Sequence, residues 1–213
     1  MSARTIAQTI LCLLFLQLAL LGAFSGRLAS EPLSLKEKVG RLNHAGFRTR
    51  AHCSAFLVAG RGMVTAAHCL PDTGTDTVHI LLAYDRGAFS RHVKTSSRRF
   101  RQVKDKDLAV LCDDTEKQAG LSLLEPKLEP GQAVFVRGYG VPKVHLQHAY
   151  NCSVKAVSDQ GIGTLDCPLP PGMSGAPVIR AKDGKVFGVV SASGRNRSLF
   201  STINAEILGE VCS

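Results

Sequence analysis

Several patterns that would assign this chain to other protein classes are missing from its sequence. None of its seven cysteines forms a C-x-x-C pair, which argues against a thioredoxin-type redox site and a zinc framework. No repeat of fixed period and no low-complexity tract is present, so neither a solenoid nor a disordered chain is expected. With 213 residues, of which 45% are hydrophobic and 20% charged, the composition is globular and allows one domain or two small barrels.

Charge is absent from residues 5–25, which are mostly apolar. Arg4 precedes this run, and Ala23 and Ser25 form a small-x-small pattern at its end. The pattern is typical of a secretory signal peptide, although the run is also about long enough to span a bilayer as an uncleaved anchor. Because two glutamines interrupt the run, we predict a signal peptide over residues 1–25, a secreted or periplasmic protein, and no membrane contact after cleavage.

The remaining cysteines agree with export. An even number of cysteines in an exported chain predicts disulfides, here three. These cysteines are Cys53, Cys69, Cys112, Cys152, Cys167 and Cys212. His145 and His148 lie three residues apart, but no further ligand pattern joins them. We therefore expect no metal site, and no motif indicates a cofactor.

Between residues 54 and 203, short segments rich in β-branched and aromatic residues alternate with Gly, Pro, Asp or Asn. This pattern predicts many short strands. The segments are 54–60, 62–67, 77–85, 108–112, 132–140, 153–157, 176–181, 185–193 and 199–203. This spacing favours an all-β barrel or sandwich. Residues 113–131 are polar and proline-bearing and are predicted to link two β halves, and Asn204 is predicted to cap a short closing helix. Residues 26–48 are interpreted as an N-terminal arm or propeptide.

Basic residues outnumber acidic ones by 26 to 17, and many of them lie close together. Residues 86–106 contain eight Lys or Arg and a single acid, Asp105. The segment is either a contact surface for polyanions or a solvated hairpin with basic flanks. Since no nucleic-acid-binding motif accompanies the charge, the hairpin is favoured and no specific nucleic acid is expected as a partner.

Ser174 and His68 stand in contexts that suit nucleophilic catalysis. Ser174 lies in "PPGMSGAPV", a tight turn ahead of an apolar run, although many serines occur in turns without any catalytic role. His68 ends the apolar strand in "GMVTAAHC", next to Cys69. A bridge from Cys69 to Cys53 would close this hairpin and hold the loop that carries His68.

A serine hydroxyl attacks a carbonyl only when an imidazole accepts its proton and a carboxylate orients that imidazole. Asp107 opens "DLAVLC", and a carboxylate that leads into a buried strand requires a partner such as an imidazolium. Asp105 lies among lysines and is expected to be exposed. Asp107 is therefore the predicted partner of His68, with an ordinary strand-entry cap as the alternative.

The blocks "TAAHC", "DLAVL" and "GMSGAPV", in that order, resemble those of the chymotrypsin-like (trypsin-fold) serine proteases, over a stretch from about Cys53 to Cys212. The order differs from that of α/β-hydrolases, where the histidine follows the nucleophile, and from that of subtilisins, where the aspartate comes first. The "GMSGAP" form is similar to the bacterial and glutamyl-endopeptidase branch. The resemblance implies two antiparallel six-stranded β-barrels with a short C-terminal helix, with residues 49–125 in the first barrel and 126–213 in the second.

The resemblance also implies a function. The chain would be a secreted, monomeric serine endopeptidase that cleaves proteins or peptides through an acyl-enzyme intermediate. Ser174 would be the nucleophile, His68 the general base and then the general acid, and Asp107 the residue that orients His68. The backbone N–H groups of Gly172 and Ser174 would form the oxyanion hole.

The sequence departs from trypsin-like animal enzymes at the residue before the nucleophile. There an aspartate pairs with a newly cut N-terminus, whereas this chain has Met173 and lacks the usual activation sequence. We therefore predict that the protein is not activated through a new N-terminus.

Substrate preference is poorly encoded. Pro168 stands where trypsin-type relatives carry a specificity aspartate, with Asp166 nearby, and the strand over residues 190–194 lacks the histidine of glutamyl relatives. The side-chain preference is therefore left open. Backbone pairing to an extended peptide is expected from Ser191, Ala192 and Ser193.

Two further disulfides are expected. Cys152–Cys167 would lie just ahead of the oxyanion loop, which leaves Cys112–Cys212. Two other functions are considered: a catalytically inactive protease-fold protein that binds polyanions through residues 86–106, and an esterase that uses the same three side chains.

Overall fold

The computed structural model describes residues 34–44, 52–71, 77–113, 120–125 and 128–213. The predicted signal peptide lies outside these residues. The strands are β1 (Val39–His44), β2 (His52–Val58), β3 (Gly62–Thr65), β4 (Thr77–Leu82), β5 (Arg91–Ser96), β6 (Arg101–Gln102), β7 (Ala109–Cys112), β8 (Ala133–Gly138), β9 (His148–Val157), β10 (Ile162–Leu165), β11 (Pro177–Arg180), β12 (Val186–Ser193) and β13 (Ser198–Thr202). The helical segments are η1 (Leu35–Lys38), η2 (Ala67–Cys69), η3 (Ser97–Arg99) and α2 (Ala205–Cys212).

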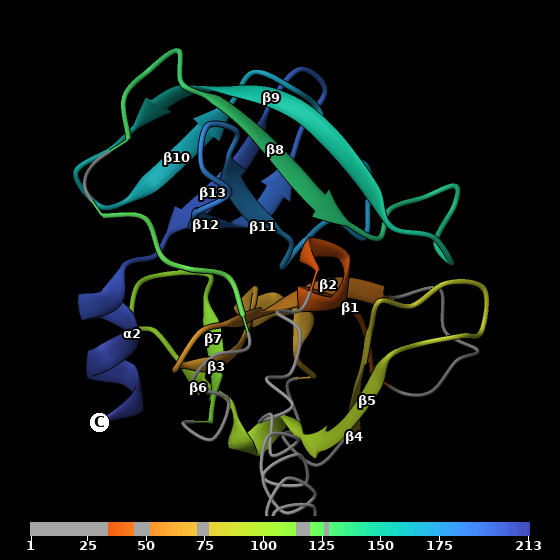
Figure 1. Cartoon of the computed structure of the whole chain (residues 1–213). Helices are drawn as coiled ribbons and strands as arrows, with labels where there is room; N and C mark the ends of the chain where they lie inside the picture. Colours follow the sequence, from red (N-terminus) through yellow and green to blue (C-terminus); the bar gives the residue numbers. More distant parts are fainter. Residues whose placement is uncertain (1–33, 45–51, 72–76, 114–119, 126–127) are drawn as a thin grey trace, which may run out of the picture. The chain divides into compact units, whose positions relative to one another are not determined.

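The strands form two antiparallel sheets, one in each half of the chain. The first has seven strands in the order β5-β4-β1-β2-β3-β7-β6, and the second is a closed barrel in the order β10-β13-β12-β11-β8-β9 (Figure 1). The predicted all-β, chymotrypsin-like architecture is confirmed. The first sheet is an open half-barrel rather than the expected closed six-stranded barrel, because its edges are the polar β5 and the two-residue β6, which do not pair.

Every segment predicted as a strand contains a strand, but β1, β5, β6 and β10 were not predicted. β1 lies within residues 26–48, interpreted above as an arm or propeptide, yet it pairs with both β2 and β4. Arg41 and Asn43 make this stretch polar, but their side chains are 4% and 2% exposed and hydrogen-bond each other. Because its removal would take away a central strand, we assign β1 to the first barrel; removal of the segment before it stays a prediction.

One hydrophobic cluster joins the two halves. It contains Phe56 and Val110 from the first sheet together with Ile179 and Val189 from the closed barrel. Asn204 caps α2 as predicted, since its side chain accepts a hydrogen bond from the N–H of Ile207 at 2.8 Å. The helix turns back beside β6 and β7, so it packs on the first sheet although it follows the second in sequence (Figure 1).

All three expected disulfides are present. Cys53–Cys69 joins β2 to η2, Cys152–Cys167 lies within the closed barrel, and Cys112–Cys212 ties α2 to β7. Three disulfides are consistent with a secreted or periplasmic protein.

In the part of the chain that the structure describes, no helix has the length and apolar character needed to cross a bilayer.

Candidate active site

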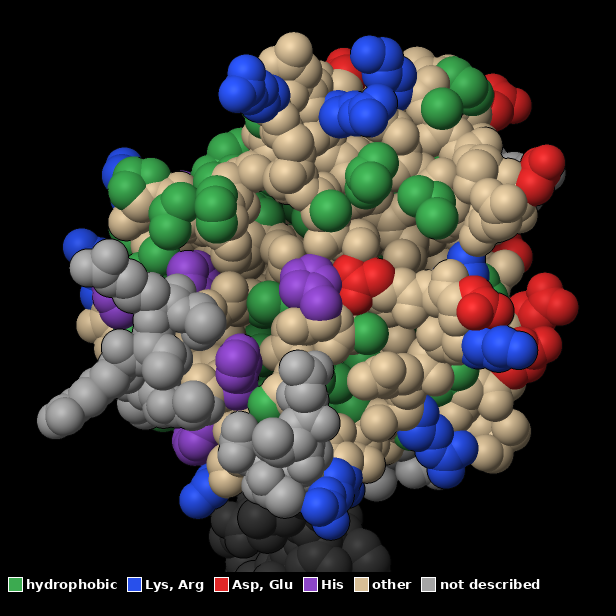
Figure 2. All heavy atoms as spheres, turned by 180° about the vertical axis from the view of Figure 1, so that it is seen from behind, with side chains coloured by type: hydrophobic (Ala, Val, Ile, Leu, Met, Phe, Trp, Pro, Cys, Tyr) green, Lys and Arg blue, Asp and Glu red, His purple; other side chains and the backbone are tan. Residues whose placement is uncertain are grey.

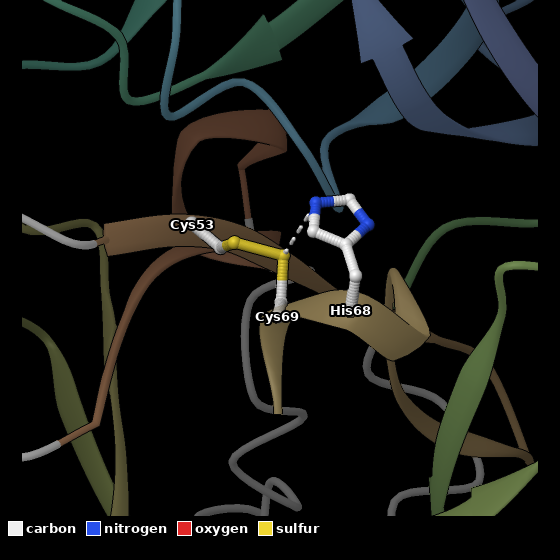
Figure 3. Close-up of side chains that lie close together, drawn as sticks. All are labelled: Cys53, His68 and Cys69. Carbon is white, nitrogen blue, oxygen red and sulfur yellow. Dashed lines mark hydrogen bonds between the residues drawn. A yellow bond between two sulfur atoms is a disulfide. The ribbon is translucent and has the colours of Figure 1, made fainter. Parts of the chain in front are cut away.

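His68 lies in η2, the short turn that follows β3. The Cys53–Cys69 disulfide anchors this turn to β2, and Figure 3 shows the imidazole projecting beside the disulfide with one ring nitrogen toward Cys69. That nitrogen, Nε2, lies 3.8 Å from the Cys69 sulfur. Both sulfurs are joined to each other and cannot act as thiolate ligands, so this Cys–His–Cys cluster is not a metal site. The disulfide holds the loop of His68, as the sequence suggested.

Asp107 accepts hydrogen bonds from both the ring and the backbone of His68. His68 Nδ1 is 2.7 Å from Oδ2, and the His68 N–H donates to Oδ1 at 3.0 Å. A third bond comes from the hydroxyl of Ser191, which donates to Oδ2 at 2.5 Å. The rival carboxylate, Asp105, is exposed and lies in a left-handed turn with φ 58°. The structure therefore pairs His68 with Asp107, within the first sheet, because β3 and β7, which border these two residues, are neighbouring strands.

These contacts shift the pKa of both partners. The hydrogen bond to Asp107 raises the pKa of His68, and partial burial offsets only part of this effect. Burial would raise the pKa of Asp107, but the hydrogen bonds from His68 and Ser191 together outweigh it and lower that pKa. Both shifts favour the ion pair. An ionised Asp107 also fixes the neutral imidazole as the Nδ1–H tautomer, with an unprotonated Nε2.

Ser174 sits between two tight turns that need glycine. The Met173 N–H donates to the Pro170 carbonyl at 3.2 Å across Gly172, whose φ is 95°. A Cβ on Gly175, at φ 79°, would lie 2.1 Å from the backbone oxygen of Ser54. Such turns present a side chain at a sharp corner of the backbone. The Ser174 hydroxyl donates to the Ser191 carbonyl at 3.5 Å, so Ser174 and Asp107 contact the same residue.

The N–H groups of Gly172 and Ser174 form no hydrogen bond within the described residues, whereas those of Met173 and Gly175 do. The carbonyl before Gly172 accepts a bond from the Val141 N–H at 3.0 Å. Because C=O and N–H point in opposite directions across a trans peptide, the Gly172 N–H points away from Val141. Two backbone donors beside Ser174 are therefore uncommitted.

Ser54 holds this turn to both sheets, and nothing in its sequence context signalled it. Its N–H donates to the Ser174 carbonyl at 2.8 Å, and its hydroxyl donates to the Gly172 carbonyl at 3.1 Å. The same hydroxyl accepts the Tyr139 N–H at 2.9 Å. With Ser54 in β2 and Tyr139 just after β8, one buried side chain fixes the Ser174 turn between the two halves.

Ser191, Ala192 and Ser193, which are expected to bind substrate, lie at the end of β12. β11 pairs with β12 as far as Val189, and Val190 still bonds to the chain just before β11. Ser191, Ala192 and Ser193 then complete β12. A register shift between Val190 and Ala192 makes Ser191 the extra residue of a bulge. This bulge lets its side chain reach Asp107, a contact that the sequence did not indicate.

Pro168, at the position where trypsin-type relatives are expected to carry an aspartate, is exposed and uncharged. Asp166, the nearby candidate, instead accepts the Ser153 N–H at 2.6 Å, and its own N–H donates to the Ser153 carbonyl at 3.1 Å. Behind Pro168, the buried hydroxyl of Ser198 accepts the Leu169 N–H at 2.9 Å. The residues at and behind Pro168 are therefore uncharged.

The chain matches the family described as the trypsin-like peptidase domain over residues 53–189. None of the curated proteins compared with the chain matches it. Among solved structures, a thermostable serine protease from an extremophilic microorganism is 17% identical, with a TM-score of 0.62 over 83% of this chain and 96% of its own. The protease Anisep from Arthrobacter nicotinovorans is 14% identical, with a TM-score of 0.61 over 82% of this chain and 93% of its own. Human heparin binding protein is 19% identical, with a TM-score of 0.60 over 79% of this chain and 87% of its own. At these identities the likeness concerns the fold, and a glutamyl-endopeptidase branch is not confirmed.

Proposed function

Because this chain belongs to the trypsin-like peptidase domain family, we propose that it is a secreted serine endopeptidase that cleaves peptide bonds through an acyl-enzyme intermediate. The observation that carries the proposal is the 2.7 Å contact between His68 Nδ1 and Asp107. Ser174 is linked to this pair through Ser191, which contacts both Ser174 and Asp107. The predicted signal peptide and the three disulfides support secretion.

Each side chain has a defined task in this mechanism. The hydroxyl of Ser174 attacks the scissile carbonyl, and Nε2 of His68 accepts its proton, since Nδ1 is committed to Asp107. The resulting imidazolium is stabilised by the carboxylate and then protonates the leaving amine. The uncommitted N–H groups of Gly172 and Ser174 bind the oxyanion. Water then repeats the sequence on the acyl-enzyme.

The free edge of β12 beyond its pairing with β11 is the proposed docking strand for substrate. An extended peptide would add to Ser191, Ala192 and Ser193 by main-chain hydrogen bonds. Asp166 lies two residues from Pro168, but its bond to the Ser153 N–H holds it against β9 and away from the position expected to select a basic side chain. We therefore propose an uncharged residue on the acyl side of the cleaved bond.

Met173 supports activity without a new N-terminus. Its side chain is 0% exposed. It fills space left by two glycines, since a Cβ on Gly138 or Gly140 would lie 3.2 Å from Met173 atoms. Apolar packing thus holds the turn where trypsin-like animal enzymes are expected to use an ion pair.

The alternative function is polyanion binding by an inactive protease fold. Within residues 86–106, Arg86 pairs with Asp85 and Arg101 donates to the Ser213 carbonyl at 2.7 Å. Lys94, Arg98, Arg99 and Lys104 remain exposed. On the face drawn in Figure 2, Lys and Arg side chains lie around the edge rather than in one patch. Because Arg86 and Arg101 already have partners, the segment offers less free positive charge to a polyanion than its sequence suggests.

Hydrolysis of casein by the secreted protein tests the proposal. We expect clearing by the wild-type chain and none by Ser174→Ala, which removes one oxygen and leaves the turn intact. Retention on heparin with no clearing by folded, disulfide-intact protein would instead support the polyanion-binding alternative.

A further inference from the structure

Lys106 precedes Asp107 and reaches from the first sheet to the second. Its ammonium donates to the backbone carbonyl of Gln160 at 2.9 Å, in the turn between β9 and β10. The side chain is half-buried, and burial lowers its pKa. The proposed mechanism makes no use of this contact.

The turn that receives Lys106 is shaped around it. Gly161 follows Gln160 with φ 74°, and its N–H donates to the Ser158 carbonyl at 2.9 Å. A Cβ on Gly161 would lie 2.4 Å from the Lys106 nitrogen and 2.4 Å from the Thr202 hydroxyl. A side chain at this position would therefore displace the Lys106 ammonium.

The loop that carries Asp107 is short and tightly bonded. The Lys106 N–H donates to the Val103 carbonyl at 3.3 Å, and the Leu108 N–H donates to the Lys106 carbonyl at 2.9 Å. Asp107 therefore cannot move independently of Lys106. A displacement of the Lys106 backbone would lengthen the bonds from Asp107 to His68 and Ser191.

The surroundings of the Gln160 carbonyl show what the loss of Lys106 would leave. The Lys106 side chain borders a cavity of about 730 Å³, whose wall includes Gln160, Phe187 and Ile207. Without the ammonium, the Gln160 carbonyl would face this cavity. Within the described residues, no other side chain donates to that carbonyl.

We propose that Lys106 is a positioning residue, which holds the Asp107 loop against the second sheet so that the carboxylate meets His68. The inference rests on the proposed function, because it assigns Lys106 a part in that same site. Lys106 touches neither substrate nor the reacting atoms.

The test is a titration of the His68 imidazole by NMR, which needs no catalytic activity. In the described part of the chain, Asp107 is the charged group whose field and hydrogen bond raise the pKa of His68. Lys106→Met keeps the length of the side chain but removes its donor, so we expect the pKa of His68 to fall toward its ordinary value. Lys106→Arg, which keeps charge and donor, should retain most of the wild-type pKa.

Lys104→Met is the matched control. Lys104 lies on the same loop, is exposed, and carries the same charge, so its loss reproduces any long-range effect of removing a cation. We expect this variant to titrate like the wild type. With the active protein, Lys106→Met should also lower kcat about tenfold with little change in KM, whereas Lys104→Met should not.

Equal His68 titrations in the two methionine variants would overturn the positioning role. A wild-type protein that cleaves no peptide would refute the proposed function, yet the titration would still decide the role of Lys106. The two failures are therefore distinguishable.

Discussion

Asp107 is the residue on which the site depends, because three hydrogen bonds converge on its carboxylate. Its partner His68 could be recognised from the sequence, since each of the two residues borders an apolar strand. The contacts that Ser191 and Ser54 make in the site could not be predicted from the sequence. Ser191 reaches Asp107 through a bulge in β12, and Ser54 meets the Ser174 turn only after the two sheets pack, and neither event leaves a local pattern.

Asp107→Asn should reduce kcat by about 10⁴ with little change in KM. The amide would accept from only one oxygen and would favour the wrong tautomer of His68, which leaves Nε2 protonated. Steady-state kinetics on a quenched peptide measures the change. A loss of less than tenfold would show that Asp107 does not orient the base.

The pH dependence of activity follows from His68. The hydrogen bond to Asp107 raises its pKa, so the imidazole stays protonated, and unable to act as a base, at pH values where a free histidine is neutral. The acid limb of kcat/KM should therefore have its midpoint above about 6.5, the ordinary histidine value.

Protonation of His68 lowers activity, but the ion pair that it forms with Asp107 stabilises the fold. Its contribution is largest between about pH 4 and 6.5, where an unfolded aspartate is ionised and an unfolded histidine is protonated. It is lost as pH rises through the raised pKa of His68 and as pH falls through the lowered pKa of Asp107. A midpoint of the acid limb of kcat/KM at or below about 6.5 would contradict the contact between His68 and Asp107.

The shape of the Ser174 turn depends on glycine. Gly175 and Gly184 both have positive φ, 79° and 69°, but only Gly175 has a close neighbour where a Cβ would stand. Gly184→Ala should cost about 1–2 kcal/mol of unfolding free energy from backbone strain alone. Gly175→Ala should cost about 1–3 kcal/mol more, because the methyl group would meet the Ser54 backbone. Urea unfolding compares them, and equal losses would refute this account of the turn.

At the level of elements, β-branched strands bordered by Gly, Pro or Asp could be predicted from sequence, and β1 could not. β1 contains Arg41 and Asn43, which are buried because they bond each other and because Arg41 lies 5.8 Å from the centre of the Tyr84 ring. Local polarity thus misled, because these contacts allow two polar side chains to be buried in a strand, although Arg41 Nε and Asn43 Nδ2 have no hydrogen-bond partner among the described residues. β5 was not predicted for a different reason: its exposed basic residues alternate with Val93 and Thr95, so the segment is polar on one face, and its pairing with β4 leaves no local signal.

At the level of the whole molecule, we predict that the protein does not need processing at residue 38 to become active. Cleavage after Lys38 should give no gain in activity. The new ammonium on Val39 would find no carboxylate at Met173, and Val39 itself is 0% exposed, so the cut should lower stability instead. Activity and melting temperature before and after the cut measure both effects. A large gain in activity would mean that a new N-terminus completes the site.

The proposed endopeptidase mechanism requires a nucleophilic Ser174 served by His68. Labelling of the disulfide-intact protein with a fluorophosphonate probe, followed by peptide mapping, tests this most directly. We predict an adduct on Ser174 that Ser174→Ala abolishes and His68→Ala strongly reduces. A folded wild-type protein that takes no label at Ser174 would contradict the account.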